Sequence, residues 1–357
     1  MKIAVIGAGI YGCHIALKLS EAGFNVDLIE RESDIMKITT DISLRAHSGY
    51  FYGRSPETMI ACNKNSKLFL KEYPNSLFDH DKHYYIIAKN GSKITGKEYL
   101  ATLDKYKLPY KKTKVPLINP DFVDVAIEVE ELSYDPNLLR EEVRIKLKKS
   151  KVNLILNTDV SDLPFREYDL RIISGYASNN DISRAITGKT IQEYEYRFCE
   201  KVIVKLPKEF YKKNFVILDG PFFQIDPYGK SEDYFALSHF QYSIHSRHEG
   251  NFFDIDKKKR SLLGKGIVKK PSITNGKDII REISKHIPGV KKAIIVGSIF
   301  AVKPVIPNEP TDSRQVVMKS IEKDTIAVLS GKVSGCIEAA EASVKYAKKL
   351  KSVINFF

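Results

Sequence analysis

A glycine-rich turn close to the N-terminus constrains the fold of this chain more than any other segment. Its residues, Gly7-Ala8-Gly9-Ile10-Tyr11-Gly12, fit the pattern G-x-G-x-x-G. The turn follows a strand-like apolar segment, Lys2 to Ile6, and opens a segment with helical spacing of apolar residues, Ile10 to Ala22. Asn25 to Glu30 has the composition of a second strand. A helical crossover makes the two strands parallel, so the sequence predicts a strand–helix–strand unit that binds a dinucleotide.

Each position of this turn has a physical role in dinucleotide binding. We expect Gly7 to allow the tight turn and Gly9 to let a pyrophosphate approach the backbone. Gly12 is expected to allow close packing of the helix against the strand. Ile10 and Tyr11 begin the helix, where free N–H groups and the positive end of the helix dipole favour phosphates.

The glycine pattern does not distinguish NAD from FAD, but the end of the chain favours FAD. Glu30 is expected to accept hydrogen bonds from ribose hydroxyls, and Arg31 to lie along the adenine. Near the C-terminus, a predicted strand at Thr325 to Ser330 is followed by the turn Gly331-Lys332-Val333-Ser334-Gly335 and a predicted helix, Cys336 to Leu350. This turn would direct a second helix N-terminus at a ligand, where the helix dipole stabilises the negative charge of a reduced flavin.

The composition is that of a globular chain with an excess of positive charge. At roughly 150 residues per domain, the 357 residues correspond to about two domains, and the 43% hydrophobic content excludes disorder as the dominant state. The formal net charge is +13, but the lysines are scattered, which favours a solvated surface over a nucleic-acid interface. The four cysteines lie far apart and form no C-x-x-C pair, so we expect neither a zinc site nor a disulfide framework.

No segment has the composition of a membrane span or a signal peptide. The longest apolar run, Ala293 to Val302, has about ten residues, whereas a spanning helix needs ~20. The N-terminal residues, Met1 to Gly7, form a predicted strand and then the glycine turn. We therefore expect a cytoplasmic protein with a small-molecule substrate, and a homo-oligomer remains open.

The order of predicted elements indicates an α/β fold with two domains. A discontinuous Rossmann-like FAD-binding domain is predicted from residues 1–75, 135–190 and 295–357, and an antiparallel β-sheet substrate domain with helices from 76–134 and 191–294. Helices are predicted at Pro56 to Glu72 and at Asn137 to Lys149, the second capped by Asp135 with Pro136 at its first position. We expect the charged run Lys257 to Arg260 to be a loop between strands.

Further segments, in this order, carry a resemblance to a known family. They are Arg45 to Tyr50, Asp135 to Arg140, Asn157 to Val160, Asp169 to Gly175 and Ser330 to Gly335. Together with the glycine turn, they resemble the D-amino acid oxidase and glycine oxidase-like (DAO) superfamily of FAD-dependent oxidoreductases, over nearly the whole chain. The run Arg45 to Ser55 is also similar to bacterial members that occur with surface-polysaccharide genes.

The resemblance implies FAD as the cofactor and gives roles to matching positions. Val160 would place its backbone against the adenine, and Ser174 and Gly175 would lie near the pyrophosphate. Gly331, Lys332 and Val333 would line the pyrimidine of the flavin. The segment Thr39 to Gly49, which includes Ser48 and Gly49, would pass along the isoalloxazine ring.

Two departures from the family pattern bear on the substrate. Family amine oxidases commonly carry Arg-Pro where this chain has Lys303-Pro304, and a lysine lacks the planar fork that holds a carboxylate at two points. Arg314 could compensate. The chain also has Thr39-Thr40-Asp41-Ile42-Ser43 in place of a small Ser-Gly turn before the flavin.

Four residues near the expected flavin ring are candidates for the chemistry. His47 is the first candidate for a base or an orienting group, although a structural histidine or a covalent link to the flavin are alternatives. Arg45 would present a fixed positive charge to flavin or substrate, or else pair with an acid. Tyr50 and Tyr52 share a face if their segment is extended, where they would cap a polar substrate or pack in the core.

The sequence thus predicts an FAD-dependent oxidase or dehydrogenase that oxidises a C–N or C–O bond of a small polar substrate. With the polysaccharide association, that substrate would be a sugar or nucleotide-sugar derivative. The alternatives are an NAD-dependent dehydrogenase and a flavoprotein with non-redox, mutase-like sugar chemistry.

Overall fold

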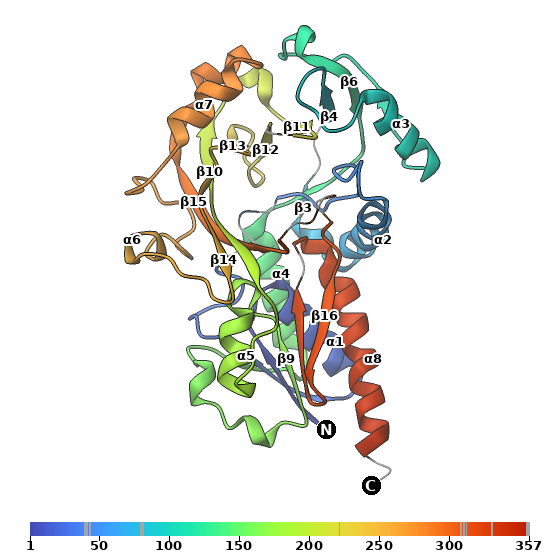
Figure 1. The fold of residues 1–357 in the computed structure, drawn as a ribbon, viewed down its shortest axis with the longest axis vertical. Coiled ribbons are helices and arrows are strands. Elements are labelled where there is room, and N and C mark those ends of the chain that lie inside the picture. Colours follow the sequence, from blue (N-terminus) through green and yellow to red (C-terminus); the bar gives the residue numbers. More distant parts are fainter. Residues whose placement is uncertain are drawn as a thin grey trace.

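Two β-sheets, one above the other in Figure 1, form the framework of the molecule. The computed structural model describes residues 1–38, 42, 44–78, 82–220, 222–307, 309, 311, 313–329 and 331–354. Thr39 to Asp41, Ser43 and Ser330, which the sequence places near the flavin, lie outside these ranges. No helix of the described chain has the length and apolarity to cross a bilayer.

The first sheet is the predicted dinucleotide-binding sheet. Its strands, in spatial order, are β16 (Val317–Glu322), β17 (Thr325–Leu329), β9 (Leu170–Ile173), β1 (Lys2–Ile6), β2 (Asn25–Ile29) and β8 (Asn153–Ile155). Every neighbouring pair is parallel except β16 with β17. The chain therefore returns to this sheet after long excursions, as the discontinuous Rossmann-like prediction requires.

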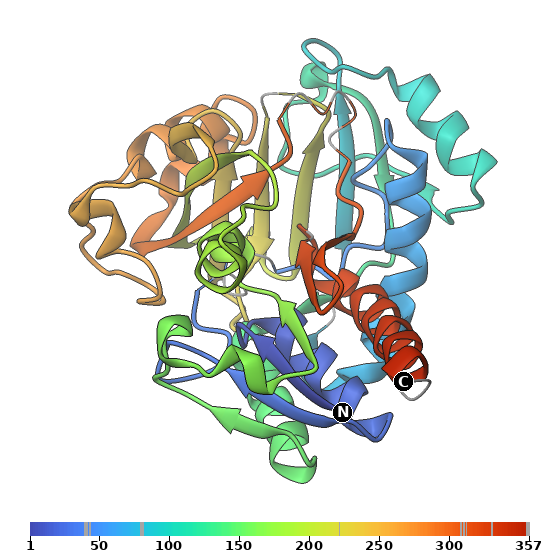
Figure 2. The same ribbon diagram turned by 60° about the horizontal axis from the view of Figure 1, so that its bottom comes forward.

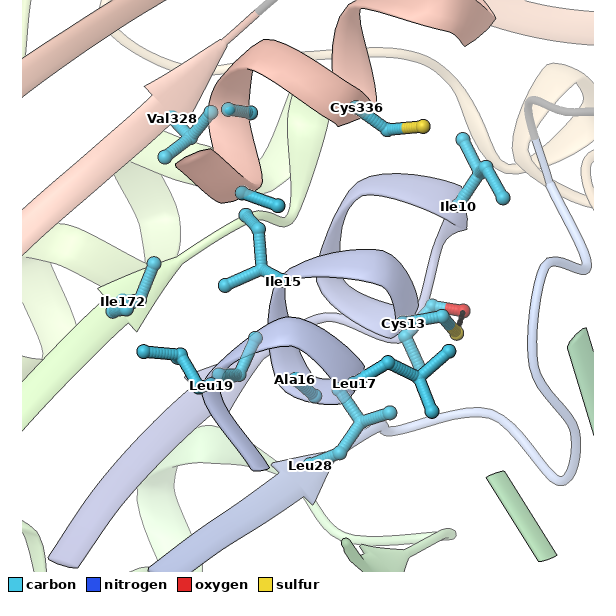
Figure 3. Packing of buried hydrophobic residues seen from close by; sticks show 14 of the residues in the cluster. Ile10, Cys13, Ile15, Ala16, Leu17, Leu19, Leu28, Ile172, Val328 and Cys336 are labelled. Carbon is cyan, nitrogen blue, oxygen red and sulfur yellow. Dashed lines mark hydrogen bonds between the residues drawn. The ribbon is translucent and has the colours of Figure 1, made fainter. Parts of the chain in front are cut away.

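Helices cover both faces of the first sheet because its strands are apolar on both sides. On one face, α1 (Ile10–Glu21) packs with α4 (Pro136–Lys149) and α8 (Cys336–Ile354). Figure 3 shows α1 at the centre of this layer, with Ile15 and Leu19 toward Ile172 and Val328 of the sheet. On the other face, α5 (Asn179–Thr187) lies against β9 and β17.

The second sheet is long and almost entirely antiparallel. Its strands, in order, are β14 (Ile244–Gly250), β10 (Tyr194–Lys205), β13 (Tyr234–His239), β12 (Phe223–Pro227), β11 (Lys213–Leu218), β4 (Lys82–Ala88), β6 (Val123–Glu128) and β5 (Lys111–Lys112). Only β4 and β11 are parallel, which joins the two separated stretches of chain that form this sheet. Helices α3 (Gly96–Lys105) and α7 (Gly276–Ser284) pack on β6 and β13. The predicted fold class is confirmed, with this one parallel pair added.

Two local predictions were wrong. Strand β15 (Ile294–Val305) pairs along the whole of β10, so residues 295–305 belong to the second sheet and not to the FAD-binding segment 295–357. Figures 1 and 2 show β10 and β15 side by side. The run Lys257–Arg260 forms a helical turn, α6, because the Asp256 side chain accepts the Lys259 N–H and caps it.

The remaining elements are a helix at its predicted position, a short strand pair between the sheets, and three elements that the sequence did not predict. Helix α2 (Pro56–Glu72) has the predicted bounds, and β3 (Leu77–Phe78) pairs with β7 (Ser133–Tyr134) between the sheets. The sequence did not predict β14, β16 and α5, because their apolar patterns are short or are interrupted by many polar residues. Apart from β15, the division into two domains stays a prediction.

Candidate active site

A cavity of ≈ 1160 Å³ runs from the glycine turn of the first sheet to the inner face of the second sheet. Pockets for small molecules usually have ~300–1,000 Å³, so this cavity is large enough for an extended ligand and a second, smaller one. Most of the predicted site residues line it: Gly7, Gly9, Ile10, Tyr11, Glu30, Arg31, Arg45, His47, Tyr52, Val160, Ser174, Gly175, Lys303, Arg314, Gly331, Lys332 and Val333.

The glycine turn has the geometry that the motif predicts. Gly7 has φ +102°, and a Cβ on it would lie 2.8 Å from the Ser174 carbonyl oxygen. The Ser174 hydroxyl donates to the Gly7 carbonyl at 2.9 Å, so the end of β9 is locked onto the turn. A Cβ on Gly12 would lie 1.8 Å from the Gly7 carbonyl oxygen. Gly12 therefore serves packing and, unlike Gly7, does not line the cavity.

Gly9 leaves a cradle in front of helix α1. It is the N-cap of this helix, and it offers no side chain to the free N–H groups of the first turn. A Cβ built on Gly9 would meet no atom within 4 Å, although its neighbours in the turn are crowded. An open space at a helix N-terminus fits a pyrophosphate, which is negatively charged and accepts several hydrogen bonds.

Glu30 braces the turn from the end of β2. One carboxylate oxygen accepts the Ala8 N–H at 2.7 Å, and the other accepts the Glu32 N–H at 3.0 Å. The Glu30 carbonyl accepts the Thr158 N–H at 3.0 Å, which holds the loop with Val160 beside the cavity. Arg31 is exposed next to this group and its Nε lies 3.8 Å from a Glu32 carboxylate oxygen.

The turn before α8 meets the start of α1. The Tyr11 hydroxyl donates to the Lys332 carbonyl at 2.6 Å, which joins the two helix N-termini. The Lys332 ammonium lies 5.2 Å from the ring centroid of Phe51 and 5.0 Å from that of Tyr52. Burial, and to a lesser extent Arg45, lowers the pKa of Lys332 to about 7. Ser334 is buried behind the turn and does not line the cavity, so its predicted contact with the cofactor is not supported.

His47 faces the cavity from a strained position. It has φ +51°, in the left-handed region that residues other than glycine seldom adopt. The side chain is buried, and its Nδ1 has no hydrogen-bond partner among the described residues. Burial, followed by the charge of Lys332, lowers the pKa of His47 well below its usual value. The imidazole is therefore neutral at physiological pH, and one ring nitrogen has a lone pair that can accept a hydrogen bond.

Three neighbours of His47 lie outside the cavity, contrary to prediction. The Ser48 N–H donates to a Glu131 carboxylate oxygen at 2.5 Å, and a Cβ on Gly49 would lie 2.6 Å from the Met59 carbonyl oxygen. The Tyr50 hydroxyl donates to the Pro109 carbonyl at 2.6 Å, and its ring packs in the core. These residues shape the loop and do not face a ligand.

Tyr50 and Tyr52 lie on a segment that turns. The Tyr52 N–H donates to the Gly49 carbonyl at 3.0 Å, so the run is not extended. Both rings belong to one buried apolar cluster, but Tyr50 does not line the cavity. Tyr52 lines the cavity, and its buried hydroxyl has no hydrogen-bond partner among the described residues. Of the two tyrosines, Tyr52 is the one that lines the cavity.

Arg45 belongs to a buried charge cluster that the sequence did not reveal. Its Nη2 donates to Gln224 at 2.8 Å, and its Nε lies 3.1 Å from a carboxylate oxygen of Asp226. The Lys201 ammonium donates to the other Asp226 oxygen at 2.7 Å. Burial alone would raise the pKa of Asp226, but Lys201 and Arg45 outweigh it and hold that pKa well below its usual range. Asp226 thus contacts both cations, and the buried carboxylate of Glu131 adds further negative charge near Arg45.

Lys303 and Arg314 add positive charge to the same cavity. Lys303 lies on β15 opposite Arg197 of β10 and forms no ion pair with any residue that the structure describes. The Arg314 N–H donates to the Thr58 hydroxyl at 3.2 Å, which fixes the backbone of Arg314 beside α2. Within the described ranges, no three His, Cys, Asp or Glu side chains converge as they would around a metal ion.

Residues 2–172 match the family model described as DAO, FAD dependent oxidoreductase. The match covers slightly less than half of the chain, and over this part the chain is similar to the DAO family. The match confirms the predicted cofactor, FAD, and argues against the NAD-dependent dehydrogenase alternative. The open cradle at Gly9 and the unpartnered polar atoms of His47 and Tyr52 fit such a group.

Comparisons with solved structures show a similar fold over nearly the whole chain. Glycine oxidase from Geobacillus kaustophilus is 12% identical, with a TM-score of 0.70 over 98% of this chain and 94% of that one. L-alpha-glycerophosphate oxidase from Mycoplasma pneumoniae, solved with FAD bound, is 16% identical, with the same TM-score and coverage. In sequence, the FAD-dependent monooxygenase kojA of Aspergillus flavus is 31% identical over 86 residues, 24% of this chain. That match covers 20% of the length of this curated relative.

Proposed function

We propose that this chain is an FAD-dependent oxidase or dehydrogenase that oxidises a C–N or C–O bond of a small substrate with an anionic group. The observation that carries the proposal is a group of cations at the wall of the second sheet, one of which, Lys303, has no ion-pair partner among the described residues. Arg45 and Lys201 share the single carboxylate of Asp226, and Lys303 has no ion-pair partner in the described chain. A carboxylate or phosphate on the substrate would balance this charge.

The residues of the first sheet would hold FAD along the cavity. The N-terminus of α1 at Gly9 would take the pyrophosphate, and Glu30 the adenosine ribose. Val160 would contact the adenine, and the turn at Lys332 the pyrimidine end of the flavin. When bound, FAD accepts the electron pair released as the substrate C–H bond breaks.

The chain's own groups would orient the substrate and move its proton. Lys303 and Arg45 would hold the anionic group against the second sheet. His47 is neutral, and its unprotonated ring nitrogen would accept a hydrogen bond from the substrate amine or hydroxyl, toward which that proton could move as the substrate is oxidised. The buried hydroxyl of Tyr52 can donate a hydrogen bond to the same substrate atom.

The names of the structural neighbours support this substrate class. Glycine carries a carboxylate and an amine, and glycerophosphate carries a phosphate and hydroxyls; both combine an anionic group with an oxidisable C–N or C–O bond. A sugar acid or a nucleotide sugar combines the same two features and is the more specific form of the proposal.

Anaerobic reduction of the purified flavoprotein tests the proposal. The panel comprises amino acids, 2-hydroxy acids, glycerol 3-phosphate, sugar acids and nucleotide sugars, each with an uncharged analogue. We expect loss of flavin absorbance with one anionic class and none with its uncharged analogue. Isomerisation of a sugar without net flavin reduction would select the mutase-like alternative, and reduction by uncharged analogues alone would contradict the anionic substrate.

Lys303 variants test the contact itself. Lys303→Met should raise the KM of the active substrate about tenfold or more, which corresponds to the loss of ~1.4 kcal/mol of binding. Lys303→Arg keeps the charge and should recover most of this loss. The matched control is Lys319→Met on β16, whose side chain is exposed. A KM for Lys303→Met within about twofold of that control would refute the assignment.

A further inference from the structure

Glu131 is a buried carboxylate close to two candidate site residues, His47 and Arg45. It contacts residues that hold these two in place, and it does not line the cavity itself. Its side chain is 2% exposed, and it lies between β6 and β7. One carboxylate oxygen accepts the Ser48 N–H at 2.5 Å. The other accepts the hydroxyl proton of Tyr85, on β4.

The first contact acts on the backbone at His47. Ser48 follows His47 directly, and His47 has a left-handed backbone conformation. The hydrogen bond from the Ser48 N–H therefore fixes the orientation of the peptide plane between these two residues. The Ser48 carbonyl is held as well, because the Asn63 amide donates to it at 3.2 Å. The preceding residue, Ala46, donates its N–H to the Leu132 carbonyl at 3.1 Å. The loop with His47 is therefore tied to the segment that carries Glu131.

The second contact acts on the side chain of Arg45. The Tyr85 hydroxyl donates to Glu131 and accepts a hydrogen bond from Arg45 Nη1 at 3.1 Å. Because a hydroxyl has a single proton, the orientation that serves Glu131 leaves the lone pairs of Tyr85 directed at the guanidinium. Glu131 thus determines that the Tyr85 hydroxyl donates its hydrogen bond to Glu131 and accepts one from Arg45.

We infer that Glu131 is a positioning residue that fixes the positions of His47 and Arg45 relative to each other at the cavity wall. It acts through Ser48 and Tyr85, and it has no contact with a ligand. The inference rests on the proposed function for the roles of His47 and Arg45. The geometric part, a carboxylate that restrains the His47 loop, stands independently of any substrate.

The test compares Glu131→Gln with a matched control, Glu142→Gln. A glutamine keeps the volume but has one acceptor oxygen, so either Ser48 or Tyr85 loses its acceptor. Glu142 on α4 is likewise a buried carboxylate that accepts a backbone N–H, from Ser76 at 3.1 Å, and it does not line the cavity. Tyr85→Phe is the second variant, because it cuts only the link to Arg45.

The first readout is amide hydrogen exchange of residues 44–52 in the FAD-loaded protein. We expect exchange of the Ser48 amide to be about tenfold faster in Glu131→Gln, since Ser48 and Tyr85 then compete for one acceptor oxygen in place of two, and unchanged in Glu142→Gln. Equal exchange in the two variants would overturn the inference. This measurement needs no substrate, so it remains decisive if every compound of the panel fails and the proposed function falls.

The second readout is the split between kcat and KM with the substrate that the panel identifies. We expect Glu131→Gln to lower kcat about tenfold or more through His47, and Tyr85→Phe to raise KM with kcat within about threefold. A merely structural role would give Glu131→Gln the same kinetics as Glu142→Gln and would overturn the inference. If Glu131→Gln does not fold, an unchanged KM in Tyr85→Phe overturns it, and a raised KM supports it.

Discussion

The lowered pKa of Lys332 gives the FAD-free protein a pH dependence of defined sign. The pKa falls from 10.5 to about 7 because the ammonium is buried near the charge of Arg45. Between these two pH values the unfolded chain binds a proton at this site that the folded chain has released. The free energy of unfolding therefore rises with pH through this window, and the cost of the buried charge is fully present below pH 7.

Replacement of Lys332 by methionine should remove that cost. At ~1.4 kcal/mol per pH unit, a pKa lowered from 10.5 to about 7 corresponds to roughly 5 kcal/mol. The side chain keeps some contact with solvent, and its ammonium faces the rings of Phe51 and Tyr52, so we reduce this value to about 2 kcal/mol. Methionine preserves most of the aliphatic packing.

Urea unfolding of the FAD-free protein at about pH 6 and pH 10 measures the effect. We expect Lys332→Met to be more stable than the unmodified chain by about 2 kcal/mol at the lower pH, with little difference at the higher pH. The exposed Lys319→Met variant should show no such dependence. A Lys332→Met protein that is less stable at pH 6, or equally shifted at both pH values, would refute the assignment of a buried charge to this turn.

Two further variants test the buried contacts of the site. Asp226→Asn leaves two buried cations without their shared carboxylate and should lower the free energy of unfolding by about 3 kcal/mol; a chemical denaturation midpoint equal to that of the unmodified chain would contradict the shared pair. Tyr50→Phe removes a hydrogen bond in the core and should cost about 1 kcal/mol in the same assay with kcat unchanged; a large drop in kcat at full FAD content would return Tyr50 to the active site.

The sequence predicted best what depends on local backbone geometry. The glycine turn works through residues adjacent in the chain, so its pattern predicted the crowding at Gly7 and Gly12 and the open space at Gly9. The bounds of α2 and the Asp135 cap of α4 were also predicted, since proline and a capping side chain mark helix starts locally. The interpretation of FAD over NAD used the turn before α8, which the structure places against α1 through Tyr11.

The charge cluster of the second sheet could not be predicted from the sequence. Lys201 and Asp226 lie on β10 and β12, which are separated in space by β13, and their contact depends on the register of all three strands. Glu131 reaches the site only because its segment runs beside that of Arg45, through a bridge to Ser133. Without knowledge of the strand pairing, each of these residues cannot be told from any other polar residue of a strand-rich segment.

The meaning of the net charge of +13 depends on where the cations are buried. Most lysines are exposed, where water and salt screen them and they set solubility more than ligand choice. Arg45 and Lys201 are buried at the cavity wall, where the lower dielectric strengthens each interaction with a ligand. Lys303 faces the same space without an ion-pair partner in the described chain. On the proposed function, these cations of the cavity wall and not the surface lysines select the substrate, so a chain with the same cavity but a neutral surface should select the same anions.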